Sequence, residues 1–292
     1  MLAAAVMACF SQMESFAANK FLDGVTTTIN ASNFDAMKAD LGELCAGKNV
    51  SANMTEGITT NLTLDFAGKT WDKEIKGGNY LAGNYTSKVE SSNLTFKAGT
   101  FTAAIFGTGN YTVSSGSYEV GSSNITIEGG TFSSRVSLGG WSSASTGKPI
   151  EIGTANLIVR GGSFTGNNQG LYGLGRSGGS SKEHVKNVNF TIGAAPVFSA
   201  TGFIISGGGY EAAFIGTADH KKLTLDGTNN EDQFKTVLFK EWDEISVING
   251  GNASIYSFDN SGNSNGTTVI KSGAGTLTLV NAMTSLTNGF TL

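Results

Sequence analysis

The chain has 292 residues, a length that suits one or two compact domains or one elongated solenoid. Gly contributes 41 residues and Pro only 2, which excludes a collagen pattern and a Pro-rich linker. Charged residues make up 14% of the chain, the net charge is −4, and the three arginines are Arg135, Arg160 and Arg176. This scattered charge provides no basic stripe for nucleic acid.

The first residues are typical of an export signal. Leu2 to Phe10 is an apolar run, and Ser15-Phe16-Ala17 supplies a cleavage-site pattern, so we expect residues 1–17 to be removed. Alternatives are a disordered apolar terminus, or a lipoprotein box at residues 6–9. No apolar run in the sequence reaches the ~18 residues of a transmembrane helix.

Residues 18–60 are expected to form an N-terminal cap that contains a short helix. Ser32 or Asn33 can cap its start, and Gly47 can end it. The apolar stripe of this helix has spacings of three, four and three residues: Phe34, Met37, Leu41 and Leu44. Such a helix would cover the apolar end of a stack of repeats.

One motif recurs along the chain. It consists of Asn, alternating apolar residues, a Gly-rich turn, a hydroxyl residue and Phe, and it occupies residues 93–101, 124–132 and 156–164. The first residues of these copies are 31 and 32 positions apart (124 − 93 and 156 − 124). A period of this size predicts stacked repeats of about 31 residues, which we expect from residue 61 to residue 266.

The motif predicts two structural columns that run along the stack. Equivalent residues of parallel rungs lie about 4.8 Å apart. We therefore expect an amide ladder and an aromatic ladder, whose members are Asn61, Asn93, Asn124 and Asn156, and Phe101, Phe132 and Phe164. The Gly pairs that follow each copy, such as Gly139-Gly140, are expected to allow positive φ at corners.

Residues 61–70 read Asn-Leu-Thr-Leu-Asp-Phe-Ala-Gly-Lys-Thr and follow the expected helix. This combination resembles the entry into the pectate-lyase-like right-handed parallel β-helix superfamily. The resemblance implies an all-β, single-stranded right-handed parallel β-helix with a short N-terminal capping α-helix.

The last part of the chain carries a second resemblance. Lys271, Gly273, Gly275, Leu277 and Leu279 are similar to the autotransporter-associated β-strand repeat, so residues 267–292 are expected to be one such repeat. The resemblance implies a passenger region at a bacterial surface or outer membrane. We expect the chain to be a fragment, with further rungs or an outer-membrane barrel translocator downstream.

Residues that interrupt the repeat are the candidate ligand or partner contacts. Arg176 to Lys186 is expected to be a projecting polar loop that holds Arg176 and His184, and Trp141 and Tyr172 lie beside Gly-rich turns. Exposed aromatic faces can stack on sugars or anchor a partner, whereas the simpler interpretation is that they fill a corner. Tyr210 is expected to occupy the place of Phe101 in a further copy.

No catalytic or cofactor motif is identified in the sequence. His184 and His220 have no nucleophile motif beside them, and Cys45 lacks a partner for a metal site. The loops that begin at Asp226 and Asp259 superficially resemble calcium loops but have no closing bidentate Glu, and plain turns explain them. We expect no cofactor.

The sequence therefore predicts a secreted or surface-displayed passenger-type adhesin or structural stalk, without catalytic activity, whose partners are glycans or surface proteins. The alternative is a carbohydrate-active enzyme, a polysaccharide lyase or glycoside hydrolase, on the same scaffold. Two or three carboxylates within about 5 to 9 Å of each other in a groove would favour the enzyme. A tailspike-like fibre would require trimerisation, and no interface is marked.

Overall fold

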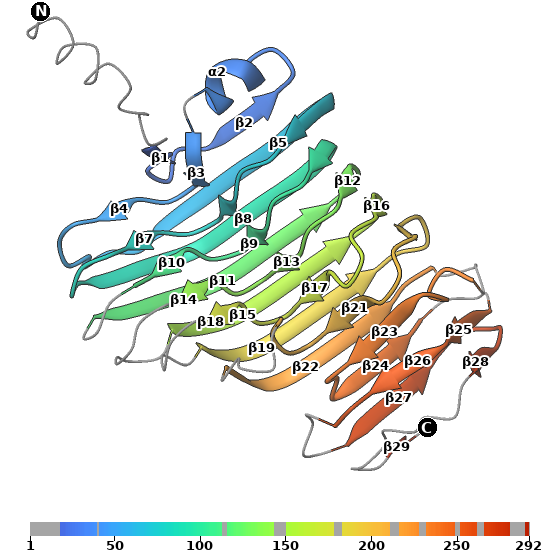
Figure 1. Cartoon of the computed structure of the whole chain (residues 1–292). Helices are drawn as coiled ribbons and strands as arrows, with labels where there is room; N and C mark the ends of the chain where they lie inside the picture. Colours follow the sequence, from blue (N-terminus) through green and yellow to red (C-terminus); the bar gives the residue numbers. More distant parts are fainter. Residues whose placement is uncertain are drawn as a thin grey trace, which may run out of the picture.

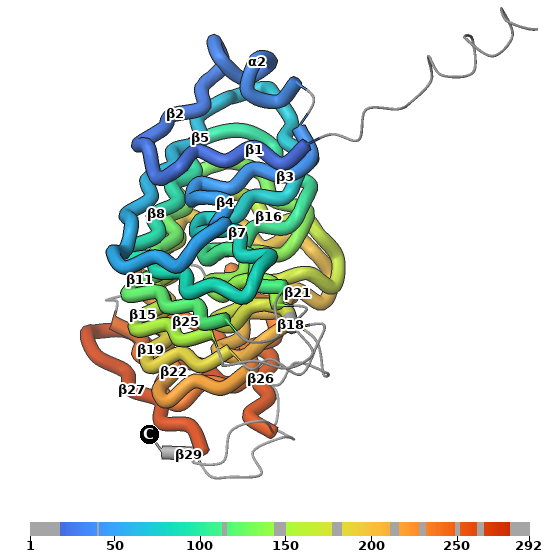
Figure 2. Tube along the Cα trace, turned by 90° about the vertical axis from the view of Figure 1, so that its left-hand side faces the viewer, coloured from blue at the N-terminus to red at the C-terminus, as the bar shows by residue number. Residues whose placement is uncertain are grey.

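The structure is a computed structural model that describes residues 18–39, 41–112, 116–142, 150–177, 183–210, 216–227, 232–248, 252–261, 266–280 and 290–291. It is a nearly all-β parallel solenoid of about six turns, here called rungs. Figures 1 and 2 show the rungs stacked from the N-terminal to the C-terminal end. The predicted export signal, residues 1–17, lies outside the described residues.

Three parallel sheets form the walls of the solenoid, and strands of successive rungs are neighbours in each. Sheet B is the longest and contains β2 (Thr27–Asn30), β5 (Ile58–Trp71), β8 (Thr86–Phe101), β11 (Ser117–Ile127), β12 (Thr131–Phe132), β15 (Ile150–Val159), β16 (Ser163–Phe164), β19 (Glu183–Ile192), β20 (Val197–Phe198), β22 (Thr217–Leu225), β24 (Glu244–Val247), β27 (Thr267–Lys271) and β29 (Phe290–Thr291).

The other two walls consist mainly of short strands. Sheet A contains β1 (Ala18–Phe21), β3 (Leu41–Cys45), β6 (Ile75–Lys76), β9 (Ile105–Phe106), β13 (Val136–Ser137), β17 (Gly170–Tyr172), β21 (Phe203–Ser206), β23 (Val237–Lys240) and β26 (Ser257–Asp259). Sheet C contains β4 (Asn49–Val50), β7 (Tyr80–Leu81), β10 (Asn110–Tyr111), β14 (Trp141–Ser142) and β18 (Arg176–Ser177). A separate pair is formed by β25 (Ala253–Ile255) and β28 (Leu277–Leu279).

Alternation of apolar and polar residues places the core inside the three walls. In sheet B, Leu94 pairs with Ile125, which pairs with Leu157, and all three are buried. The intervening side chains, such as Thr95 and Thr126, lie on the outer face. Each rung therefore buries its apolar residues only by stacking on its neighbours.

Both predicted ladders are present. The amide ladder extends one member further than predicted, because Asn189 donates to Asn156 Oδ1 at 3.1 Å. Phe132 stacks between Phe101 and Phe164, with ring centroids 5.0 and 5.2 Å apart. Phe164 then stacks on Phe198 at 5.1 Å, so Phe198 continues the aromatic ladder.

The glycines of the repeat have two different roles. Gly130 and Gly162, in the turn before the ladder Phe, have φ of +100° and +95°, a region that favours glycine. The prediction of positive φ was wrong for the corner pair Gly139-Gly140, where neither residue is among those with positive φ. A Cβ on Gly140 would lie 2.4 Å from Gly109 O, so close packing of rungs requires glycine there.

The predicted helix is much shorter than its apolar stripe suggested. Helix α2 (Phe34–Lys38) has five residues, and Asn33 at its start makes no side-chain capping hydrogen bond. Leu41 and Leu44 are buried in strand β3 instead, because pairing with β1 and β6 decides their conformation. Phe34 packs on Phe66 with ring centroids 4.8 Å apart, so the short helix still covers apolar surface.

Two further expectations are corrected, and the terminal repeat is placed. Tyr210 does not occupy the ladder position, which belongs to Phe198. Glu183 to Lys186 belong to strand β19, so the expected loop at 176–186 is largely strand in its described residues. Leu277 and Leu279 pair with β25 and not with sheet B, whereas Val269 pairs with Ile245 and continues the solenoid.

Candidate functional site

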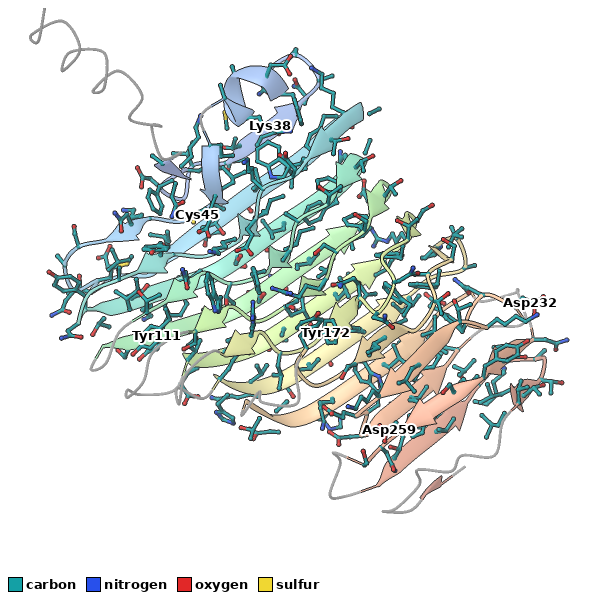
Figure 3. All side chains as sticks on the ribbon, in the orientation of Figure 1. Lys38, Cys45, Tyr111, Tyr172, Asp232 and Asp259 are labelled. Carbon is teal, nitrogen blue, oxygen red and sulfur yellow. The ribbon has the colours of Figure 1, made fainter. Side chains whose placement is uncertain are left out.

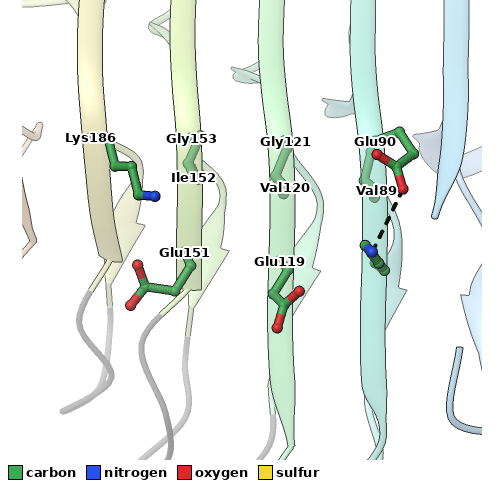
Figure 4. Close-up of a pocket in the computed structure, with 10 residues that line it drawn as sticks. Val89, Glu90, Glu119, Val120, Gly121, Glu151, Ile152, Gly153 and Lys186 are labelled. Carbon is green, nitrogen blue, oxygen red and sulfur yellow. Dashed lines mark ion pairs between the residues drawn. The ribbon is translucent and has the colours of Figure 1, made fainter. Parts of the chain in front are cut away.

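A groove of about 350 Å³ crosses the outer face of sheet B. Figure 4 shows neighbouring strands β8, β11, β15 and β19 presenting their side chains to it. Its lining residues are Lys88, Val89, Glu90, Glu119, Val120, Gly121, Glu151, Ile152, Gly153 and Lys186. We call this feature the sheet B groove.

The groove forms where the regular alternation of each strand is interrupted. In β8, Val89 and Ser92 are buried, while the two residues between them, Glu90 and Ser91, both have exposed surface. The same interruption occurs at Gly121 in β11 and at Gly153 in β15, in register with β8. Bulge-like interruptions bend strands, and here they are stacked from rung to rung.

Glycine is required at the floor of the groove because the backbones approach closely. A Cβ on Gly121 would lie 2.5 Å from Glu90 O, and one on Gly153 would lie 2.5 Å from Gly121 O. Two adjacent rungs therefore lack a side chain at the position that Glu90 and Lys186 occupy on either side. This absence of side chains gives the groove its depth.

Charged side chains form a column along one side of the groove. Lys88 pairs in register with Glu119, Glu119 with Glu151, and Glu151 with His184. Lys88 Nζ lies 3.7 Å from Glu90 Oε1. Within the part of the chain that the structure describes, Glu119 makes no ion pair. Glu119 is thus the free carboxylate at the centre of the groove.

His184 links three rungs through its two ring nitrogens. Nδ1 lies 2.7 Å from Glu151 Oε2, and Nε2 lies 2.9 Å from Asp219 Oδ1. Both contacts are hydrogen bonds only when both nitrogens carry protons, so the arrangement favours the imidazolium. Hydrogen bonds to Asp219 and then to Glu151 raise the pKa of His184 above its usual value.

The four candidate contacts predicted from the sequence fall on three different walls of the solenoid. His184 adjoins the sheet B groove, whereas Trp141 and Arg176 pair in register in sheet C. Tyr172, labelled in Figure 3, lies in sheet A. It is only 1% exposed, so its side chain is buried. The structure therefore brings Trp141 and Arg176 together but does not join them to His184.

Sequence reasoning missed Lys88, Glu119 and Glu151, although the sequence contains a signal for them. Each lies five residues before a ladder asparagine, as His184 does before Asn189. The outward residues between the apolar pairs are mostly hydroxyl residues. The charged column lies several residues before them, ahead of the asparagine at which the repeated motif begins.

A buried carboxylate lies next to His184. Glu183 accepts hydrogen bonds from Gly140 N at 3.0 Å and from Gly175 N at 2.5 Å. Burial raises the pKa of this carboxyl group from 4.5 to about 7, although the two hydrogen bonds act in the opposite direction. Tyr118 occupies the equivalent position two rungs earlier, where its hydroxyl accepts from Asn79 N and Gly109 N.

The described residues contain no group of three His, Cys, Asp or Glu side chains that could hold a metal ion. The two predicted loop segments that begin at Asp226 and Asp259 lie partly outside the described residues. In the same described ranges, no helix is long and apolar enough to cross a membrane. Comparisons with family models, with curated proteins and with solved structures find no match to this chain.

Proposed function

We propose that the chain is a secreted or surface-displayed β-solenoid that acts as an adhesin or structural stalk. The observation that carries this proposal is the outer face of sheet B, where polar side chains form straight columns across the rungs. One such column comprises Thr63, Thr95, Thr126, Ile158, Thr191 and Thr224, and it continues through Ser246 to Ile270, so its apolar members are Ile158 and Ile270.

A face of this kind suits adhesion for two physical reasons. The strands fix the side chains in advance, so little conformational entropy is lost when a partner binds. The same contact also recurs on each rung, so an extended partner such as a glycan can engage several rungs at once and gain affinity from multivalency. The ladders of Asn and Phe supply the rigid axis that a stalk needs.

The test is binding of the full chain to immobilised glycans and surface proteins. Thr126→Lys places a charge in the centre of the polar column, and we expect it to weaken binding at least tenfold. Thr201→Lys, at an exposed turn outside that column, is the matched control and is expected to bind like the parent chain. Equal binding by both variants would contradict a role of the outer face of sheet B in adhesion.

Export is tested separately. Residues 1–17, fused to a periplasmic reporter enzyme in a Gram-negative host, are expected to deliver active reporter outside the cytoplasm. Retention of the reporter in the cytoplasm would contradict secretion by this signal. Binding by the outer face of sheet B is tested independently by the binding experiment.

A carbohydrate-active enzyme is the second candidate, and one observation favours it. Glu119 and Glu151 are paired on adjacent strands in the sheet B groove. Because adjacent strands are about 4.8 Å apart, the two side chains start from neighbouring positions on one groove, where a glycosidase needs a pair of carboxyl groups. Glu151 Oε2 also lies 2.7 Å from His184 Nδ1, which holds this carboxylate in one place.

Release of reducing ends from a panel of polysaccharides tests this second candidate. The enzyme predicts activity in the parent chain that Glu119→Gln and Glu151→Gln each abolish. Activity that survives both substitutions would exclude these carboxylates as the catalytic pair.

A further inference from the structure

Two exposed side chains of opposite charge line the sheet B groove. They are Glu119 on β11 and Lys186 on β19. Among the residues that the structure describes, neither side chain makes an ion pair. The groove thus presents one negative and one positive charge to solvent.

The strands on both sides of Glu119 are described, so the charges beside it are known. Glu119 lies between Lys88 and Glu151. Lys88 Nζ lies 3.7 Å from Glu90 Oε1, the contact dashed in Figure 4, and Glu151 Oε2 lies 2.7 Å from Nδ1 of His184. Both neighbours of Glu119 are therefore engaged elsewhere.

Lys186 is in a comparable position at the other end of the groove. It lies at the level of Gly153 on one side, which offers no side chain, and of Asp219 on the other. Asp219 Oδ1 lies 2.9 Å from Nε2 of His184, and within these described strands it makes no ion pair with Lys186. Figure 4 shows the Lys186 side chain directed from β19 toward β15.

The space between the two charges has a floor without side chains. Gly121 and Gly153 form this floor, and the groove has a volume of about 350 Å³. Single exposed charges are normally solvated and need no ligand. These two charges differ because they line one cavity, and its glycine floor lets the backbone of a ligand approach closely.

The register of the strands sets the distance that a ligand must cover. One strand separates β11 from β19, so the two lie about 10 Å apart. Lys186 is level with Gly121, two residues beyond Glu119, which adds about 7 Å along the strands. The backbone positions of Glu119 and Lys186 are therefore about 12 Å apart.

We propose that the sheet B groove binds a short peptide with free termini, of dipeptide length. The ammonium group of the peptide pairs with Glu119, and its carboxylate pairs with Lys186. Its backbone lies over the glycine floor. An extended dipeptide spans about 7 Å, and a charged contact adds about 2.8 Å at each end, so the two together cover about 12 Å.

This inference does not rest on the adhesive function, because the groove does not include the polar column that contains Thr126. It shares the groove with the second candidate function but involves no bond cleavage. Each idea has its own ligand and readout. A chain that binds no peptide leaves the test of polysaccharide cleavage intact, and a chain that cleaves no polysaccharide leaves the peptide test intact.

The first experiment is ligand-observed saturation-transfer NMR with the full chain. Its probes are glycine, glycylglycine, N-acetyl-glycylglycine, which lacks the ammonium group, and glycylglycinamide, which lacks the carboxylate. We expect glycylglycine to bind saturably and at least threefold more tightly than glycine. Each blocked peptide is expected to lose at least fivefold in affinity, because one of the two ion pairs is missing.

Substitutions then test the two side chains. Glu119→Gln and Lys186→Gln are each expected to weaken glycylglycine binding at least fivefold. Glu128→Gln and Lys97→Gln remove the same charges at exposed positions outside the groove. These matched controls are expected to bind like the parent chain.

Exchange of the two charges provides the strictest test. Glu119→Lys and Lys186→Glu should each weaken binding at least tenfold when made alone. The double variant restores one charge of each sign and should bind within threefold of the parent chain, with the peptide reversed. The proposal is overturned if no peptide binds saturably, if the blocked peptides bind like glycylglycine, if the Gln variants bind like the parent chain, or if the double variant binds no better than the single reversals.

Discussion

Asn156 donates from Nδ2 to Asn124 Oδ1 at 2.8 Å across the space between two rungs. Asn124 in turn donates to Asn93 Oδ1 at 2.9 Å, and Asn93 donates to Asn61 Oδ1 at 3.1 Å. Each internal amide is thus both a donor and an acceptor along the axis. The direction of donation is the same at every step, so the ladder distinguishes the two ends of the solenoid.

Replacement of an internal member should cost more than the loss of one hydrogen bond. Asn124→Ala removes the acceptor of Asn156 and a donor to Asn93, and we expect the free energy of unfolding to fall by about 1–2 kcal/mol. Asn124→Asp places a carboxylate oxygen against Asn93 Oδ1 and should cost more. Urea denaturation measures both, with Asn49→Ala at an exposed position of β4 as the control. A cost no larger than that of the control would contradict the ladder.

Phe132 stacks between Phe101 and Phe164 and is 1% exposed. Phe132→Ala should lower the free energy of unfolding by about 3–5 kcal/mol, because it opens a cavity that neighbouring rungs cannot close. Phe132→Leu fills part of that space and should cost less. Val197→Ala, at a residue that is 54% exposed, is the control for chemical denaturation. Similar midpoints for Phe132→Ala and the control would refute the aromatic ladder.

Glu183 should make the protein less stable as the pH rises. Its pKa is raised from 4.5 to about 7 by burial, so the folded state holds its proton more tightly than the unfolded state does. The stabilisation is complete below pH 4.5 and is lost as the pH rises to about 7. The loss is on the order of 3 kcal/mol, from about 1.4 kcal/mol for each pH unit.

Urea midpoints measured from pH 4.5 to pH 8 test this effect. Glu183→Gln has no titrating group and should show a smaller decline across that window, whereas Glu119→Gln, at an exposed position, should decline like the parent chain. An identical pH profile for the parent chain and Glu183→Gln would show that Glu183 does not titrate as expected.

His184 should titrate above its ordinary pKa of 6.5, because it donates to Asp219 and Glu151. Its contribution to stability is complete below pH 6.5 and is lost as the pH rises through the folded pKa. Exposure of all three side chains makes this contribution small and sensitive to salt. NMR titration of the ring measures the midpoint, and His220→Gln assigns the signal.

The partners of His184 can be separated in the same titration. Asp219→Asn should lower the midpoint more than Glu151→Gln, since the hydrogen bond to Asp219 has the larger effect on the pKa. Glu119→Gln, which changes a carboxylate that does not contact the ring, should leave the midpoint within a few tenths of a pH unit. A midpoint at or below 6.5 in the parent chain would contradict the bridging arrangement.

The solenoid could be predicted because its determinants are local and repeated. Asn93, Asn124 and Asn156 and the ladder Phe residues occur at fixed offsets, and stacking imposes those offsets. Phe198 was missed because it lies nine residues after Asn189, whereas the other ladder Phe residues lie eight after their Asn. One extra residue in the turn was enough to hide the match and to favour Tyr210.

The helix and the groove could not be predicted in the same way. Leu41 and Leu44 have the spacing of a helical stripe, but β3 pairs with β1 on one side and β6 on the other. These strand pairings stabilise the extended conformation more than the spacing favours a helix. The sheet B groove depends on Glu90 and Ser91 both facing outward, and only strand register reveals this. The contact between His184 and Asp219 joins residues 35 positions apart, although the repeat spacing here is 33.

Successive rungs repeat the same ladder contacts, which makes the length of the solenoid adjustable. Each rung contacts only the rungs next to it, so excision of residues 93–123 would join Ser92 to Asn124 and present Asn61 with an equivalent amide. The aromatic ladder would also remain continuous, because Phe132 would take the place of Phe101. The molecule would become about 4.8 Å shorter and keep both ladders, while it would lose the hydrogen bonds of Tyr118 to Asn79 and Gly109. The length of the solenoid is thus set in steps of one rung.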